Sequence, residues 1–257
     1  MGDRRDAVGS RRVTTSRARL DVHTCGGDAR WRAACEAPQR WVVRRDGARV
    51  DAVHQLLGDG IFAGDAHRLR LTAAPGTHVT VLGLAATPLR PGARSAMATS
   101  ITVAAGAFVL SLPGALIPQR GSDHASSLRA DVADGGSAVL ATVVAPGRTA
   151  MGERCAFARL RLRTWLRQAG RVAFAEDATL AGGPAARSLF DGFDVALTVF
   201  ALGATPAADV DWWRELAPGG VTGGATRLRS GGAAFRALCP TLGRAQELLA
   251  RLEDRLA

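Results

Sequence analysis

Apolar side chains alternate with polar ones in several short runs through the middle of the chain. In the segment HRLRLTA, arginines separate Leu69 and Leu71, so the apolar residues fall on every second position. This period of two is typical of a half-buried β-strand, whose successive side chains point to opposite faces. His67 has the same parity as the two leucines, which is more typical of a satisfied core histidine than of a ligand.

The alternating runs recur at a fixed spacing. The stretches PGTHVTVLG, AGAFVLSLP and GGSAVLATV align on Gly76, Gly106 and Gly136, which are 30 residues apart. Another strand-like run precedes each copy, and a looser fourth copy turns at Gly170. Each unit therefore reads as a strand, a tight turn that uses the positive φ of glycine, and a second strand. We expect residues 66–176 to be predominantly β-strand.

Two architectures fit these units. They could be hairpins of a β-sandwich, or rungs of a β-solenoid in which each rung buries its apolar face on the next. A constant period favours stacked repeats, and small residues such as Ala, Gly, Ser and Thr suit the crowded interior of a stack. The expected fold class is therefore mainly β, a β-helix or solenoid-like stack of short strands with a few C-terminal helices.

The C-terminal third has a different pattern. One more strand is expected at 193–201, a short helix in the run DVDWWREL, and a glycine-rich loop at 218–233. The last stretch is amphipathic at helical spacing. Its apolar stripe consists of Leu242, Ala245, Leu249, Leu252 and Leu256. This helix either packs on the sheet or binds a partner.

The chain divides into a short tail and one expected domain. Residues 1–16 are rich in arginine, and we expect them to form a mobile tail. Residues 17–257 are expected to form a single domain, β-rich over 17–201 and helical over 206–257.

One uncharged run must be tested as a membrane segment. No charge occurs between Arg94 and Arg120, a length that could span a bilayer. Gly106, Pro113 and Gly114 interrupt the run. Two buried strands explain it better than one spanning helix, so we expect no membrane partner.

Composition adds a strong positive charge. All 33 basic residues are arginine, and the formal net charge is +10. Lys, Asn and Tyr are absent, and their codons are AT-rich, so the arginine excess reflects genome bias before it reflects binding. Such a charge attracts nucleic acid, an anionic membrane or an acidic protein. A nucleic-acid reader would interleave its basic residues with stacking aromatics, which are scarce here. An acidic protein fits at least as well, and we expect no nucleic-acid partner.

The four cysteines suggest a reducing compartment. They lie at positions 25, 35, 155 and 239, and no pair has C-x-x-C spacing. Reduced thiols, together with an N-terminus that lacks the apolar run of a signal peptide, predict a cytoplasmic protein.

No catalytic motif is visible. The sequence contains neither G-x-S-x-G nor H-E-x-x-H, so we expect no enzymatic activity. Two carboxylates beside glycines stand out instead: Asp65 after Gly64, and Glu153 after Gly152.

Four motifs in order resemble the UreD (UreH) family of urease accessory proteins. The first is Gly64-Asp65 before an L-x-L strand and Pro75-Gly76, and the second is Ala85-Ala86-Thr87. The others are the proline-rich stretch Pro113–Pro118 and the block Gly147–Glu153. The sequence departs from the family pattern at Ala63, Leu84, Pro88 and Ala115.

The resemblance implies a β-helical scaffold rather than an enzyme. Members of this family bind UreF, which recruits the GTPase UreG, and together they dock on apo-urease and deliver nickel to its active site. Nickel is thought to pass through an internal tunnel. The resemblance therefore implies nickel in transit and no tightly bound cofactor.

Three side chains are candidates for contact with a passing nickel ion. Asp65 and Glu153 offer carboxylate oxygens, and His67 offers a nitrogen. A transfer path wants few and weak sites, because a tight closed site would trap the ion. Each residue also has a structural alternative. Asp65 could accept hydrogen bonds in the Gly60–Gly64 turn, and Glu153 could form an ion pair with a neighbouring arginine, Arg148 or Arg154.

A carbohydrate-acting enzyme on a β-solenoid or sandwich is the alternative function. It would need paired carboxylates on a groove with aromatic sugar platforms. The five Trp residues are spread through the chain and Tyr is absent, so the sequence favours the maturation factor.

Overall fold

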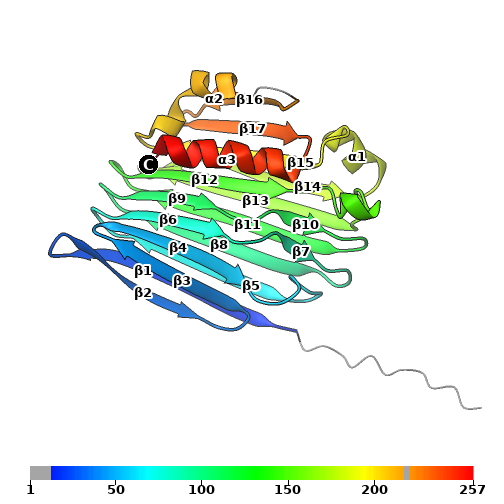
Figure 1. Cartoon of the computed structure of the whole chain (residues 1–257), viewed down its shortest axis with the longest axis horizontal. Coiled ribbons are helices and arrows are strands. Elements are labelled where there is room, and N and C mark those ends of the chain that lie inside the picture. Colours follow the sequence, from blue (N-terminus) through cyan, green and yellow to red (C-terminus); the bar gives the residue numbers. More distant parts are fainter. Residues whose placement is uncertain (1–12, 217–219, 257) are drawn as a thin grey trace, which may run out of the picture.

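Two β-sheets face each other across the core of the computed structural model, which describes residues 13–216 and 220–256 (Figure 1). The seven-stranded sheet has the spatial order β14 (Arg171–Ala181), β13 (Arg159–Gln168), β11 (Asp123–Val132), β8 (Ser95–Val103), β5 (Ala66–Ala73), β1 (Thr15–Cys25) and β2 (Asp28–Cys35). The main path of the ten-stranded sheet has the order β16 (Thr222–Arg227), β17 (Ala233–Cys239), β15 (Val195–Leu202), β12 (Ser137–Val144), β9 (Phe108–Leu112), β6 (His78–Gly83), β4 (Arg49–Leu56) and β3 (Gln39–Asp46).

The middle of each sheet is parallel, as in a solenoid. Strands β5, β8 and β11 pair in parallel in one sheet, and β6, β9 and β12 pair in parallel in the other. Each strand of the first set leads through a tight turn into a strand of the second, so the chain alternates between the sheets. The mainly β, solenoid-like stack is therefore confirmed, and the units are rungs rather than hairpins. Two short strands, β7 (Thr87–Leu89) and β10 (Leu116–Pro118), pair in parallel along a third edge.

The turns between the sheets lie where expected, with one correction. Gly76, Gly106 and Gly170 have positive φ, but in the third rung the left-handed residue is Gly135 and not Gly136. A Cβ on Gly136 would lie 2.6 Å from the carbonyl oxygen of Ala104. This glycine is therefore required for close packing, and the third rung is one residue shorter than the 30-residue spacing suggested.

The register of the ten-stranded sheet agrees with this correction. Val79 pairs with Val109, and Val109 pairs with Ala138 rather than with Val139. The side chain of Ala138 therefore points between the sheets, and Val139 belongs to the cluster on the outer face.

The expected fourth copy has a different geometry. Strands β13 and β14 are antiparallel neighbours in the seven-stranded sheet, joined by the turn at Gly170. The hairpin ends that sheet instead of adding a rung. The other ends are also antiparallel: β2 pairs with β1, β3 pairs with β4, and β15 pairs with both β12 and β17.

The apolar residues form three clusters. The first lies between the sheets and includes Leu20, Leu71, Ile101, Leu140 and Phe200. The second lies on the outer face of the ten-stranded sheet, and the third lies at the end of the solenoid near Ile61 and Phe157. Full burial of each large side chain stabilises the fold by roughly 1.5–3 kcal/mol, so the stack is held mainly by contacts between rungs and between sheets.

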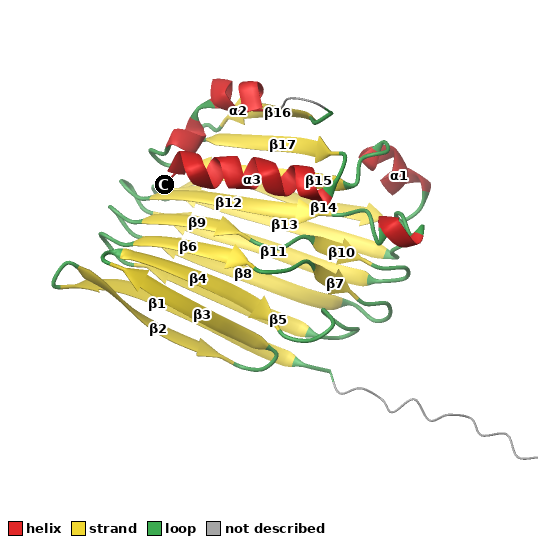
Figure 2. Ribbon diagram, viewed as in Figure 1, coloured by secondary structure: helices red, strands yellow, loops and turns green. Residues whose placement is uncertain are grey.

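Helices cover the outer face of the ten-stranded sheet (Figure 2). The helix α3 (Leu242–Leu256) packs with α2 (Val210–Leu216) and the 3₁₀ turn Pro206–Ala208 over the second cluster. The C-terminal amphipathic helix is therefore present, and it packs on the sheet. Its buried residues are Ala245, Leu248 and Leu252, while Leu242, Leu249 and Leu256 are partly buried.

Two elements were not expected from the sequence. The helix α1 (Pro184–Phe190) closes the third cluster, and β16 lies within the expected glycine-rich loop 218–233, of which 217–219 fall outside the described residues. The strand forms because its backbone pairs with β17 although its own side chains are mostly exposed.

The uncharged run from Arg94 to Arg120 folds as β8, β9 and the short strand β10, so three strands replace the two expected. Within the described ranges, the helices are too short and too polar for any of them to cross a bilayer. Of the expected N-terminal tail, residues 1–12 lie outside the described part, whereas Thr15 and Ser16 begin β1.

Candidate functional site

The four sequence motifs lie along one edge of the solenoid, in the connections that return from the ten-stranded to the seven-stranded sheet. These connections stack on one another through main-chain hydrogen bonds at the right of Figure 1, near β7 and β10. The N–H of Ile61 donates to Pro88 O at 2.8 Å, that of Gln119 donates to Leu89 O at 3.0 Å, and that of Gly121 donates to Ala156 O at 2.9 Å. Motifs that are far apart in the sequence thus occupy neighbouring loops.

Asp65 is buried at the start of β5, with 2% of its surface exposed. Its Oδ1 accepts the main-chain N–H of Thr14 at 2.8 Å, and its Oδ2 accepts that of Phe62 at 3.1 Å. The hydrogen-bonding alternative considered from the sequence is therefore present. The carboxylate joins the turn before β5 to the segment that leads into β1.

His67 lies on the inner face of β5 beside Asp65, and it is buried. Its Nδ1 is 2.8 Å from Ser16 Oγ, and its Nε2 is 3.9 Å from Asp65 Oδ2. Ser16 also accepts a hydrogen bond from Gln39 Nε2 at 2.8 Å, so its hydroxyl proton is directed at His67 Nδ1. A neutral His67 then carries its proton on Nε2, the nitrogen that faces Asp65.

The same network reaches His54. The Oε1 of Gln39 lies 3.0 Å from His54 Nε2, and because an amide oxygen only accepts, His54 donates from Nε2 and keeps a lone pair on Nδ1. Burial, and secondly the nearby His67, lower the pKa of His54 to about 4. The imidazole is therefore neutral at pH 7, which is the form that binds metal ions.

A third histidine, His124, is buried on the inner face of β11. Its Nδ1 is 2.9 Å from Ser95 Oγ on the adjacent strand. Burial, and secondly His67, also lower the pKa of His124 to about 4. One end of the interior therefore holds three neutral or weakly basic imidazoles rather than a charged cluster.

Glu153 is 4% exposed, in the loop before β13. Its carboxylate accepts the main-chain N–H of Arg120 and the Nε–H of Arg148, the latter at 2.6 Å. Of the two ion pairs considered from the sequence, the structure forms the one with Arg148, and Arg154 pairs with Asp194. Like Asp65, Glu153 links neighbouring loops of the edge.

The structure brings Asp65 and His67 together but places Glu153 elsewhere on the edge. The connections before β8 and before β11 lie between the Asp65 loop and the Glu153 loop. Among the described residues, no three His, Cys, Asp or Glu side chains are grouped so that they could hold a metal ion. The edge therefore offers separate polar points rather than a closed site.

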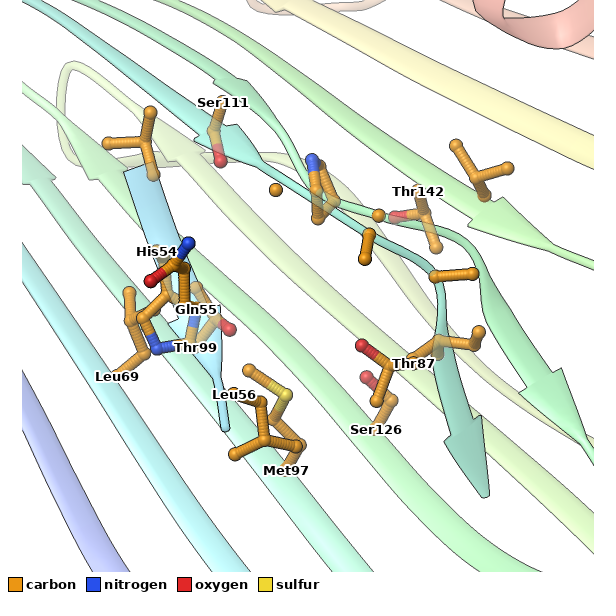
Figure 3. Close-up of a pocket in the computed structure, with 18 of the residues that line it drawn as sticks. His54, Gln55, Leu56, Leu69, Thr87, Met97, Thr99, Ser111, Ser126 and Thr142 are labelled. Atoms are coloured by element: carbon orange, nitrogen blue, oxygen red, sulfur yellow. The ribbon is translucent and has the colours of Figure 1, made fainter. Parts of the chain in front are cut away.

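An internal cavity of about 310 Å³ lies between the two sheets (Figure 3). Aliphatic residues from both sheets line it: Leu69, Leu71, Val81, Ile101, Leu128 and Leu140. Polar and sulfur-containing lining residues are His54, Gln55, Thr87, Met97, Thr99, Ser111, Ser126 and Thr142. The lining contains no carboxylate and no arginine.

The predicted site residues flank this cavity and do not line it. His67 is the in-register neighbour of Met97, which contributes its side chain to the lining. The network His67–Ser16–Gln39–His54 then leads from Asp65 to His54 on the cavity wall. Glu153 has no such link through the interactions described above.

Two loops separate the cavity from the surface beside α3. Residues 82–86 and 113–114 line both the cavity and a groove of about 230 Å³ against α3. These loops touch through their backbones: a Cβ on Gly114 would lie 1.9 Å from Ala85 O, and one on Gly83 would lie 2.1 Å from Gly114 N. The second and third motifs thus build this wall. Leu84, one of the departures, is 69% exposed on it.

Sequence reasoning did not identify the cavity residues. Thr99, Ser126, Ser111 and Thr142 all sit at inward-facing positions of their strands. Hydroxyl residues at the buried parity of four strands were the available signal. They had been interpreted as small residues that fill a crowded interior, and here they border open space instead.

Comparison with known proteins identifies the family. The model of the family described as UreD urease accessory protein matches residues 14–257. A UreD of Opitutus terrae is 30% identical over 216 residues, covering 77% of this chain and 76% of the relative. UreD 1 of Methylobacterium radiotolerans is 30% identical over 185 residues, covering 70% of this chain and 64% of the relative. A UreD of Rhodopseudomonas palustris is 33% identical over 139 residues, covering 53% of this chain and 49% of the relative.

These matches define first a class and then a family. The chain is an accessory protein and not an enzyme. It belongs to the UreD family of urease accessory proteins. The chain spans between about half and two thirds of the length of several relatives it matches, for example 64% of the Methylobacterium protein and 49% of the Rhodopseudomonas protein.

Proposed function

We propose that this protein is a urease maturation factor. It links UreF, and through UreF the GTPase UreG, to apo-urease, and it helps to pass nickel to the urease active site. The observation that carries the proposal is the family match over residues 14–257 on a fold with a cavity between its sheets. Nickel is the cargo in this proposal, and no tightly bound cofactor is required.

The chemistry of the cavity supports transit rather than storage. Hydroxyl, amide and thioether groups are neutral and weak ligands for a divalent ion, and His54 adds a neutral imidazole. A site with several carboxylates would hold Ni²⁺ tightly and slow its release. An uncharged, partly polar interior therefore suits an ion that must leave again.

Asp65, His67 and Glu153 take a flanking role in this proposal. Asp65 and His67 place an oxygen and a nitrogen 3.9 Å apart at one end of the network that leads to the cavity. Each carboxylate is held by main-chain hydrogen bonds yet keeps lone pairs that can contact an ion briefly. We propose that these groups shape the route and contact nickel in transit.

The alternative of a carbohydrate-acting enzyme is not supported. The matched relatives are accessory proteins by name, and the described cavity has no carboxylate to act as acid or base. The proposed location is the cytoplasm, and its support is the four cysteines, which are all free.

Gene deletion tests the proposed function. In a urease-positive host that carries this gene, the deletion strain should contain urease protein that is poor in nickel and inactive. Plasmid-borne wild-type protein should restore both the nickel content and the activity. Normal nickel content in urease purified from the deletion strain would contradict the proposal.

A further inference from the structure

The outer face of the seven-stranded sheet carries a cluster of arginines on β1, β2 and β5. We call it the arginine face, and it consists of Arg17, Arg19, Arg30, Arg32, Arg68 and Arg70, all exposed. The helices pack on the other sheet or at the end of the solenoid, so they leave these side chains open to solvent.

Like charges are placed in register on this face. In the parallel pairing of β1 and β5, Arg17 is the direct neighbour of Arg68, and Arg19 is the direct neighbour of Arg70. Neighbouring strands are only about 4.8 Å apart, and like charges at such positions are unfavourable. The native fold alone therefore gains nothing from this arrangement.

Carboxylates offset little of that charge. Arg19 forms an ion pair with Asp21 at 2.5 Å. In the part of the chain that the structure describes, no ion pair is formed by Arg17, Arg68 or Arg70, nor by their neighbours Arg30 and Arg32. The six arginines and Asp21 leave a local net charge of +5, counted as six minus one.

The other half of the same sheet provides an internal comparison. Arg161 and Arg163 both pair with Asp177, at 2.6 and 2.9 Å, and Arg129 pairs with Asp131 at 3.2 Å. The charge there is offset within the chain. Positive charge left without a carboxylate is thus a local property of β1, β2 and β5 and not of the whole face.

A low floor lies beside the arginine face. Arg68 is followed in its row by Ala98 and then Ser127, and Arg70 is followed by Ser100, before the next arginine, Arg129. The distance from β5 to β11 is two strand spacings, about 10 Å, which matches the width of one helix or extended segment. A partner segment can therefore approach the arginine stems closely.

We propose that the arginine face is the docking surface for an acidic segment of a protein partner. Guanidinium groups bind carboxylates in bidentate fashion, and carboxylates between the paired rows relieve the repulsion that the fold leaves in place. A protein is favoured over nucleic acid because the rows beside the arginines hold Ala and Ser rather than bases' stacking partners. The inference does not depend on which assembly the protein joins.

A pair of matched variants tests this surface. Arg68→Gln/Arg70→Gln removes two charges from the arginine face, and Arg161→Gln/Arg163→Gln removes two charges from the offset half of the same sheet. Binding of a short fluorescent poly-glutamate peptide to the full chain is measured by anisotropy at low salt. We expect the first variant to weaken binding about fivefold or more and the second to leave it nearly unchanged. Arg70→Gln alone, expected to weaken binding about twofold, serves if the first variant does not fold.

The outcomes separate the alternatives. Equal losses in both double variants mean that only net charge matters and overturn the proposal, as does no loss in either. A DNA duplex or phosphatidylserine vesicles provide the other probes. If one of them binds more tightly than the peptide and depends in the same way on Arg68 and Arg70, the surface serves nucleic acid or membrane, and the protein-docking proposal is overturned.

Discussion

Asp65 shows how a single buried carboxylate can hold together the edge that carries the sequence motifs. Its oxygens accept N–H groups from Thr14 and Phe62, so it fixes both the entry of β1 and the turn before β5. Hydrogen bonds to a charged group contribute about 1.5–3 kcal/mol. An alanine at this position would leave two main-chain donors without their acceptor, and a nickel assay on that variant would confuse folding with transport.

A conservative double variant separates the two roles. Asp65→Asn/Glu153→Gln removes both charges but keeps oxygen acceptors in place, so we expect the protein to fold and to be captured with UreF and UreG. Nickel in co-expressed urease should fall well below the wild-type level, because neutral amides bind Ni²⁺ more weakly than carboxylates. Asp59→Ala, an exposed change in the same loop, is the control. Full nickel occupancy with the double variant would restrict Asp65 and Glu153 to a structural role.

The buried histidines predict how stability depends on pH. The pKa values of His54 and His124 are lowered to about 4, whereas the unfolded chain has the ordinary value of about 6.5. Between these values the unfolded state binds more protons, so the free energy of unfolding is fully present above about pH 6.5 and falls as the pH drops toward 4. Each histidine contributes on the order of 2–3 kcal/mol to this loss.

Urea unfolding at about pH 7 and about pH 5 measures this effect. His124→Gln should reduce the difference in stability between the two pH values, since one titrating group is gone. His23→Gln, at an exposed position, should leave the difference as it is. An unchanged difference in the His124 variant would show that this imidazole is not held neutral.

At the scale of elements, local patterns determined the rungs better than their exact register. The alternation at Leu69 and Leu71 and the glycine turns were sufficient to predict the strands of the solenoid. The sequence could not show that Gly135 rather than Gly136 has positive φ, because both are glycines and only the contact with Ala104 decides between them. The strand β16 was missed because pairing with β17 stabilises it, whereas its own Gly-rich sequence does not.

The wall between cavity and groove depends on glycine for steric reasons. Gly114 does not have positive φ, but a Cβ there would lie 1.9 Å from Ala85 O. Gly114→Ala should therefore lower the free energy of unfolding by about 1–3 kcal/mol through overpacking. Gly224→Ala is the matched control, because a Cβ there meets nothing within 4 Å. Equal midpoints of denaturant unfolding for the two variants would contradict this account of the wall.

At the scale of the whole molecule, the site was only partly predictable. The parity of His67 correctly indicated burial, and the position of Asp65 after Gly64 correctly indicated a turn contact. Its second partner, Thr14, is 51 residues away in the sequence, so only the folded chain reveals it. The cavity depends on how two sheets face each other, and no local pattern specifies the space left between Ser126 and Thr142.

The central claim is that nickel passes through the interior of this scaffold on its way to urease. Ser126→Leu/Thr142→Leu places larger apolar groups on the cavity from both sheets, and its effect should be confined to the interior (Figure 3). Thr179→Leu, on the exposed side of β14, is the control. The decisive measurement is the nickel content of urease matured with each variant, alongside the yield of the assembled complex. The account predicts normal assembly with all proteins and a large loss of urease nickel only with the filled cavity. Normal assembly together with full nickel in that variant would contradict it.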